Sequence, residues 1–321
     1  MNRLSREALL IRCAYLFYQE KLNIKEVADR LDISRFKVSR YLKEAEDNNF
    51  VEIKLKFPDN QFEILAIELE NKFNLKRVII VPATPEMTSE VRRTIVGKKG
   101  TDVLKEIGND KSIGITWGRT IAHMVESLPY DLINLNKITE LTGGYGMFDP
   151  RMSTSSLAPL LAKKTHASCY QMHAPIISSN EIITKNLKRD DSIKRTFNMA
   201  KNSDIAIFGA ANLSDKSMLY QAGTLTADDL SELKDNGVIG SIIGRFFDKD
   251  GNEVKTKFQK RSVSIEWEDF LKIPQRVALI GGANKSECLY GLVKGSIPTT
   301  LIIDDIAAVR LMEKIREEQE Y

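Results

Sequence analysis

A chain of 321 residues, of which 42% are hydrophobic and 28% charged, has room for two globular domains and lacks the composition of a disordered protein. Its start shows no signal-peptide cleavage pattern, no run of about 18 apolar residues occurs, and its three cysteines lie far apart. These features argue against a membrane span, a disulfide framework and a cysteine-based metal site, and we expect a cytoplasmic protein.

The net charge of +3 is unevenly distributed along the chain. Residues 1–56 contain 12 Lys and Arg against 9 Asp and Glu, whereas the remainder contains 35 of each. All of the excess positive charge therefore lies in the first part of the chain.

This first part predicts three helices. An apolar stripe at three- and four-residue spacing predicts a helix over residues 5–20. Asn23, followed by Glu26, forms a variant of the capping box and begins a second, shorter helix. Asp32 tolerates the left-handed conformation that a turn requires, and Ser34 is suited to cap a third helix.

The third helix is basic, with four Lys and Arg and no acidic residue over residues 34–43. A lone run of basic residues is more often a solvent-exposed helix face than a binding surface. Here the turn, the N-cap, the helix lengths and the charge coincide, which predicts a helix-turn-helix that binds the major groove of double-stranded DNA. The predicted DNA contacts are Ser34 at the cap, Arg35, Phe36, Lys37 and Ser39 as candidates for base edges, and Arg40 and Lys43 as candidates for phosphates.

The segment that follows predicts a domain boundary. Apolar and polar residues alternate over residues 51–57, which indicates a half-buried strand, and Pro58 ends it. A helix is expected over residues 61–73, where it either packs on the next domain or pairs with another subunit. We therefore expect a helix-turn-helix domain over residues 1–57 and an effector-binding and oligomerisation domain over residues 58–321.

The larger domain is expected to have an α/β fold. From Arg77 onward, short apolar runs such as "VIIVP", "SIGIT", "KITEL", "DIAIFGA", "RVALIGG" and "TTLIIDD" alternate with helical patterns. This alternation is typical of a Rossmann-like domain with a mainly parallel, buried sheet.

Four of these strands end in glycine-rich loops, at residues 116–120, 141–146, 208–211 and 280–286. Ligands of open α/β sheets bind beyond the carboxyl ends of the strands, so these loops are expected to converge on a site. The sequence "GGANKS", with Lys285 as its point charge, is suited to cradle an anion at a helix start. None of the loops has a nucleotide-binding fingerprint, and "GKKGT" at residues 97–101 lacks the P-loop order, so we expect a small phosphorylated or carboxylated metabolite.

Catalysis is the competing interpretation, because folds of this class also host isomerases and hydrolases. Asp204, Asp248, Asp304 and Asp305 are available for acid–base chemistry, but no nucleophile elbow, HExxH motif or metal cluster accompanies them. The three histidines, His123, His166 and His173, are scattered. No catalytic residue, metal or cofactor is assigned, and we do not expect an enzyme.

The chain resembles the SorC family of sugar-binding transcriptional regulators, whose effector domain is similar to phosphosugar isomerases. The resemblance is carried by "NIKEVADRLDISRFKVSRYLKEAEDNNFVEI", "GITWGRTI", "ELTGGYG", "SDIAIFGAANL", "GVIGSIIGRFFDKDGNEV" and "ALIGGANKSECLYGLVKG", which occur in the family's order. Two positions depart from the family pattern: Ala210 follows Gly209 in place of a "GIG"-type turn, and Thr142 stands where some relatives have lysine.

The resemblance implies a regulator of a carbohydrate-utilisation operon, controlled by a phosphorylated sugar and assembled as a dimer or tetramer. The alternative is a sugar-phosphate isomerase-like enzyme with an attached DNA-binding module. Taken together with the glycine-rich loops, the resemblance predicts effector contacts at Thr116, Gly118, Arg119, Thr120, Gly143, Gly144, Gly209, Asp248, Gly281, Gly282, Asn284 and Lys285.

Overall fold

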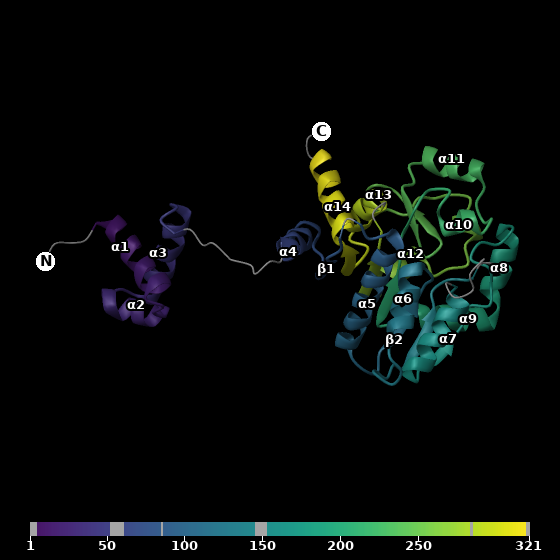
Figure 1. The fold of residues 1–321 in the computed structure, drawn as a ribbon, viewed down its shortest axis with the longest axis horizontal. Coiled ribbons are helices and arrows are strands. Elements are labelled where there is room, and N and C mark those ends of the chain that lie inside the picture. The colour runs from purple at the N-terminus through teal and green to yellow at the C-terminus, as the bar shows by residue number, and fades with distance from the viewer. Residues whose placement is uncertain (1–4, 52–60, 85, 145–152, 283–284, 319–321) are drawn as a thin grey trace. The chain divides into compact units, whose positions relative to one another are not determined.

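The computed structural model describes residues 5–51, 61–84, 86–144, 153–282 and 285–318. Contacts within the chain divide it into two compact units, Met1–Asp59 and Asn60–Tyr321 (Figure 1). The strand expected over residues 51–57 and its terminating Pro58 lie outside the described residues, except for the half-buried Val51.

The first unit is a bundle of short helices. Its elements are α1 (Arg6–Ala14), which continues into a π-helical turn (Tyr15–Gln19), α2 (Ile24–Leu31) and α3 (Arg35–Asp47). Their apolar faces meet in a small core that includes Cys13, Leu16, Val27, Val38 and Leu42.

The caps and the turn of this unit follow the local sequence signals. Asn23 and Glu26 form the complete capping box of α2. Asp32 adopts the left-handed conformation with φ 51° and ψ 49°, and the Ser34 hydroxyl accepts a hydrogen bond from the Lys37 amide at the start of α3. The helices, the turn and the caps expected from the sequence are therefore present, and the assignment of a helix-turn-helix that binds DNA stays a prediction.

The second unit is built on a seven-stranded, all-parallel sheet in the order β1-β10-β9-β5-β2-β3-β4. Its strands are β1 (Arg77–Val81), β2 (Ser112–Ile115), β3 (Lys137–Glu140), β4 (Ser168–Tyr170), β5 (Ile205–Phe208), β9 (Gln275–Ile280) and β10 (Thr300–Asp304). A three-stranded antiparallel sheet of β6 (Ala211–Asn212), β7 (Gly240–Ile242) and β8 (Arg245–Phe247) was not predicted from the sequence.

Helices cover both faces of the large sheet. Those of the described residues are α4 (Gln61–Phe73), α5 (Ser89–Ile107), α6 (Arg119–Ser127), α7 (Thr154–Thr165), α8 (Glu181–Arg189), α9 (Asp191–Lys201), α10 (Met218–Gln221), α11 (Ala227–Asp235), α12 (Trp267–Leu271), α13 (Ser286–Lys294) and α14 (Asp305–Glu317). No helix among them is long and apolar enough to cross a bilayer.

Each face of the sheet has its own core, because successive strand residues point to opposite faces. Ala278 and Ile280 of β9 pack with α4, α9, α12, α13 and α14, whereas Val277 and Leu279 pack with α5, α6 and α7. The helix at residues 61–73 thus packs on the second unit. Its buried residues Ala66 and Leu69 belong to the core on one face of the sheet.

The sheet has a topological switch point between β2 and β5. From β2 the chain proceeds through β3 to β4 at one edge, and it then returns to β5 on the other side of β2. Ile113 of β2 lies opposite Ile138 of β3 and opposite Ile205 of β5. Connections that leave β2 and β5 in opposite directions open a crevice at the carboxyl ends of these strands, where ligands of such folds bind.

Candidate DNA-binding surface and effector site

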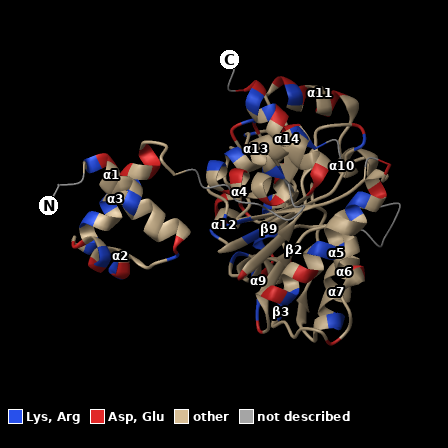
Figure 2. Cartoon of the chain, turned by 60° about the vertical axis from the view of Figure 1, so that its left-hand side comes forward, with Lys and Arg blue, Asp and Glu red and all other residues tan. Residues whose placement is uncertain are grey.

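The outer face of α3 is a continuous exposed basic surface. All the predicted DNA contacts on it are exposed, and Phe36 is the extreme case, with 79% of its surface accessible. Arg35, Lys37 and Lys43 form no ion pair with any described residue, and the Arg40 guanidinium lies over the Tyr41 ring at 5.4 Å. Figure 2 shows the basic and acidic residues along this unit. Cations without acidic partners, beside an exposed aromatic ring, suit contact with phosphates and base edges.

In the second unit, the four predicted glycine-rich loops begin at the carboxyl ends of neighbouring strands of the large sheet. They follow β9, β5, β2 and β3, which are consecutive neighbours in the sheet. The strand order thus places the four strand ends side by side, as expected from the sequence, and they include the switch point between β5 and β2.

Three cationic side chains lie at the carboxyl ends of these strands. Lys285, at the start of α13, extends across the sheet and donates a hydrogen bond from Nζ to the Ala210 carbonyl, just after β5. Arg119 begins α6 directly after β2. Arg93 comes from α5, and its Nη2 lies 3.9 Å from the position that a Cβ atom would take on Gly282. We call Arg93, Arg119 and Lys285 the cation cluster.

The cation cluster is short of negative charge. Arg119 forms no ion pair or hydrogen bond among the described residues, and Arg93 pairs at 2.6 Å with the half-exposed Glu90. Burial lowers the pKa of Lys285; nearby Cys288 acts against this, and the charges of Arg93 and Arg119 lower the pKa further. A bound anion would offset this repulsion and favour the charged ammonium.

Two helices begin at the cluster without a side-chain cap. Gly118 precedes α6 and Lys285 precedes α13, and neither supplies a capping oxygen. In contrast, α5 and α14, which also begin at the carboxyl ends of strands, are capped by Thr88 and Asp304. Uncapped first-turn amides together with the positive end of the helix dipole favour an anion.

Three of the predicted glycines use their amides within the fold. Gly282 donates its amide to Asp304 Oδ2 at 2.6 Å, Gly143 donates to the Val263 carbonyl at 2.8 Å and Gly144 to the Ala174 carbonyl at 2.9 Å. The expectation that glycines expose their amides to the ligand is thus not met at these three positions. At Gly281 the reason for glycine is close packing, since a Cβ would lie 2.8 Å from the Arg93 Cα.

The structure places the remaining predicted effector contacts differently. Thr116 and Thr120 are buried beside the β2–α6 turn, and Gly209 directly follows β5. Asp248 lies apart: its Oδ1 accepts hydrogen bonds from the Asp250 and Asn252 amides, both at 2.9 Å, within the turn after β8. Its carboxylate therefore stabilises that turn. Asn284 lies outside the described residues.

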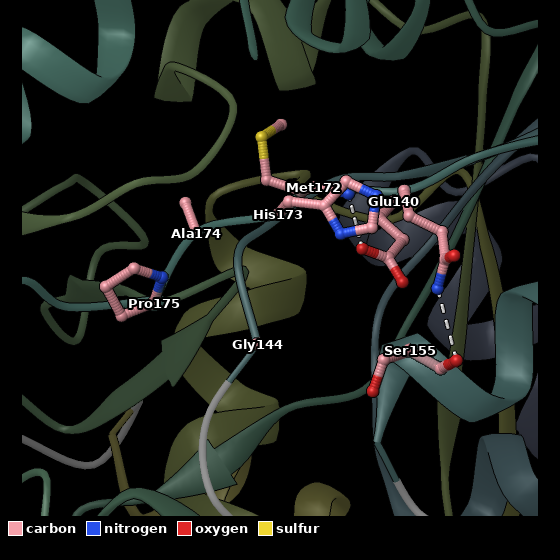
Figure 3. A pocket seen from close by; sticks show the side chains of 8 residues that line it. Glu140, Gly144, Ser155, Met172, His173, Ala174 and Pro175 are labelled. Atoms are coloured by element: carbon pink, nitrogen blue, oxygen red, sulfur yellow. Dashed lines mark hydrogen bonds between the residues drawn. The ribbon is translucent and has the colours of Figure 1, made fainter. Parts of the chain in front are cut away.

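A pocket of about 390 Å³ opens at the carboxyl ends of β3 and β4. Figure 3 shows its lining, which includes Glu140, Gly144, Ser155, Met172 and His173. Glu140 is only 2% exposed; its Oε2 accepts a hydrogen bond from the Met172 amide at 2.6 Å, and its Oε1 has no hydrogen-bond partner among the described residues.

Burial raises the pKa of Glu140 to about 7, while the Met172 amide and the nearby Gln171 side chain lower it by less. Neither Glu140 nor Arg93 was predicted as a site residue. Glu140 gives a signal in the sequence, as an acidic residue within the apolar run "KITEL", whereas nothing distinguishes Arg93 from the other cations of its helix.

The described residues contain no group of three or more His, Cys, Asp or Glu arranged to hold a metal ion. The cation cluster and the two uncapped helix starts together suit the binding of an anion.

Comparisons with known proteins agree with this architecture. Residues 61–313 match the model of a family described as "Putative sugar-binding domain". The chain is 29% identical over 311 residues to the "Uncharacterized transcriptional regulator YjhU" of Escherichia coli (94% of each chain), and 26% identical over 313 residues to the "Deoxyribonucleoside regulator" of Bacillus subtilis (97% of this chain, 99% of the relative).

Among solved structures, a DeoR family transcriptional regulator from Listeria monocytogenes is similar, with a TM-score of 0.72 and 27% identity over 78% of this chain and 98% of that chain. The full-length sorbitol operon regulator SorC from Klebsiella pneumoniae matches with a TM-score of 0.73 and 22% identity over 95% of this chain and 98% of that chain, a likeness that shows the shared fold.

Proposed function

Because the chain belongs to the SorC family of sugar-binding transcriptional regulators, we propose that it binds operator DNA through α3 and a phosphorylated sugar at the carboxyl ends of β9, β5 and β2. The observation that carries the proposal is the cation cluster at the switch point of the sheet. The phosphate group of such a sugar is a compact dianion. It would supply the negative charge that the three cations and the two uncapped helix starts lack.

The DNA-binding half of the proposal rests on the exposed face of α3. Helix-turn-helix proteins bind two half-sites about 34 Å apart, or a multiple of that, so at least two copies of the chain act together. The relatives named as regulators of deoxyribonucleoside and sorbitol operons support control of a carbohydrate-utilisation operon.

Regulation requires that the effector bind the DNA-competent and incompetent arrangements with unequal affinity, which typically corresponds to about 1 to 3 kcal/mol of coupling. The helix α4 begins the second unit directly after the unit boundary and packs into its core. It is the element through which a change at the strand ends reaches the DNA-binding unit in this proposal.

An isomerase-like enzyme is the alternative, and it would convert the bound sugar phosphate. No observation favours it. Of the four carboxylates considered for catalysis, Asp248 is engaged in the turn after β8, and Asp204 accepts a hydrogen bond from the Ser112 amide. The other two, Asp304 and Asp305, pair with Arg92. Turnover of a bound sugar phosphate by the purified protein would contradict the regulator proposal.

The proposal is tested by the thermal stability of the full-length protein with a panel of sugar phosphates and their unphosphorylated sugars. A ligand that binds only the folded state stabilises it by about 2.7 kcal/mol at 100 times its dissociation constant. We expect such a shift with a phosphosugar and its loss in Lys285→Ala.

The matched control is Lys294→Ala, at the other end of the same helix, where Lys294 pairs with the exposed side chain of Asp250 at 2.6 Å. This variant should keep the response. A response that survives in Lys285→Ala, or that occurs equally with neutral sugars, would contradict the placement of the anion.

A further inference from the structure

The pocket at the end of β3 contains a buried carboxylate that the fold does not use fully. Glu140 occupies the last position of β3 and is 2% exposed. Its Oε1 makes no hydrogen bond of normal length with a described residue, although the Gln171 amide lies near enough to lower the pKa of the carboxyl. Most buried polar atoms have a partner, so an orphan in a pocket wall indicates a missing ligand group. In Figure 3 the carboxylate extends toward the space between Gly144 and Ser155.

The strand that ends at this pocket is the neighbour of the strand that leads to Arg119 of the cation cluster. β3 is the direct neighbour of β2, and Arg119 starts the helix that follows β2. Neighbouring strands lie about 4.8 Å apart, so a ligand whose anionic end is held by Arg119 reaches the end of β3 within the length of a small sugar. Gly144, which leads from β3, lines the same pocket.

The chemistry around Glu140 restricts what can enter. Above its pKa of about 7 the Glu140 carboxyl is ionised and only accepts hydrogen bonds, so the group that then meets Oε1 must be a donor. The pocket lining offers further polar partners: Gln171, whose Nε2 donates to the Ser155 carbonyl at 3.2 Å, and His173. A second phosphate or a carboxylate would meet like charge in a buried site, which is strongly unfavourable.

We propose that Glu140 receives the hydroxyl-bearing end of the effector and excludes ligands with an anion at both ends, so that the site selects sugar monophosphates over bisphosphates. This inference rests on the proposed function and adds to it the class of sugar phosphate. The cation cluster supplies affinity for the phosphate, and Glu140 supplies selectivity at the opposite end.

The test compares the full-length protein with Glu140→Gln at pH 8. Binding of three matched pairs is measured by calorimetry: ribulose 5-phosphate and 1,5-bisphosphate, fructose 6-phosphate and 1,6-bisphosphate, and glucose 6-phosphate and 1,6-bisphosphate. Gln retains an oxygen for the Met172 amide but removes the negative charge. Asp235→Asn, which removes a charge from an exposed position at the end of α11, is the matched control.

We expect the wild-type protein to prefer the monophosphate of at least one pair, Asp235→Asn to keep that preference, and Glu140→Gln to reduce it about tenfold or more. An unchanged preference in Glu140→Gln, or a wild-type preference for bisphosphates, would overturn the role of Glu140 while leaving the proposed function standing. Failure of the wild-type protein to bind any of the six would contradict the proposed function itself.

Discussion

At the scale of single residues, the buried carboxylate of Glu140 makes stability depend on pH. Its pKa is raised from 4.5 to about 7, so the folded protein holds a proton that the unfolded chain has already released between these values. Stability at this site is therefore complete below about pH 4.5 and falls as the pH rises through 7, by up to about 3 kcal/mol.

Replacing Glu140 by Gln removes this cost. We expect Glu140→Gln to raise the melting temperature relative to the wild type at pH 8 and to raise it little or not at all at pH 5. Asp235→Asn serves as the exposed control. Equal differences at both pH values would show that the carboxylate is not the source.

Neighbouring arginines on α5 have opposite roles. Arg92 is 2% exposed and its Nη1 lies 3.0 Å from Asp305 Oδ1 and 3.4 Å from Asp304 Oδ1, whereas Arg93 belongs to the cation cluster. Arg92→Met leaves two buried carboxylates without a cation and should lower the free energy of unfolding by about 3 to 5 kcal/mol. Arg93→Met should cost far less stability in urea unfolding and should abolish the response to sugar phosphate. The reverse pattern would contradict these assignments.

Sequence alone predicted those residues whose role is local. The capping box at Asn23, the left-handed turn at Asp32 and the cap at Ser34 each depend on neighbours within four positions. Gly282 donates its amide to Asp304, and the Arg93 guanidinium lies beside Gly282. Both contacts join residues that are distant along the chain, so neither could be read from the sequence pattern.

At the scale of elements, the packing of α5 against α6 positions two members of the cation cluster. Gly97 of α5 lies where these helices lie side by side (Figure 2), and a Cβ there would be 2.6 Å from the His123 Cβ and 2.8 Å from the Thr120 carbonyl oxygen. Gly97 of "GKKGT" thus allows close approach of two helices, and Gly100, where a Cβ would lie 2.7 Å from Leu279 Cδ2, packs on β9. Both glycines lie within α5 and do not form a phosphate-binding loop.

Gly97→Ala should force these helices apart. We expect a loss of about 1 to 3 kcal/mol in the free energy of unfolding and weaker sugar-phosphate binding, because Arg93 and Arg119 move relative to each other. Lys98→Ala, at the adjacent exposed position of α5, should change neither. A stable Gly97→Ala protein with normal affinity would show that the two helices tolerate the extra methyl group.

The elements of the large sheet were predictable, but their order was not. Apolar runs alternating with helical periodicity predicted the strands of β1, β2, β3, β5, β9 and β10. Which strands pair is decided by contacts between distant residues, such as Phe208 opposite Ala278. The antiparallel sheet escaped prediction because its strands have only two or three residues.

At the scale of the whole molecule, the proposed function makes binding to DNA depend on α3 in more than one copy of the chain. Arg40→Ala and Lys43→Ala should weaken binding to all DNA sequences and reduce the slope of log affinity against log salt by about 0.9 for each lost phosphate contact. Fluorescence anisotropy at a series of salt concentrations measures this slope. Lys234→Ala, in the second unit, is the control. An unchanged slope would remove Arg40 and Lys43 from the interface.

Lys164 and Arg276 differ from Lys285 and Arg119 in how many hydrogen bonds fix their side chains. On the side of the strand starts, Lys164 donates to three backbone carbonyls at the end of α6, at 2.7 to 2.9 Å, and Arg276 donates to four carbonyls around β9. At the strand ends, Lys285 has a single carbonyl partner, and Arg119 has no hydrogen-bond or ion-pair partner among the described residues.

This division has an evolutionary consequence. Under the proposed function, substitutions at Arg93, Arg119 or Glu140 should change what the site recognises and should leave the hydrogen bonds of Lys164 and Arg276 in place. New effector specificities should then be accessible by few mutations from a stable scaffold. Libraries randomised at these three positions should remain largely folded, and libraries randomised at Lys164 and Arg276 should not.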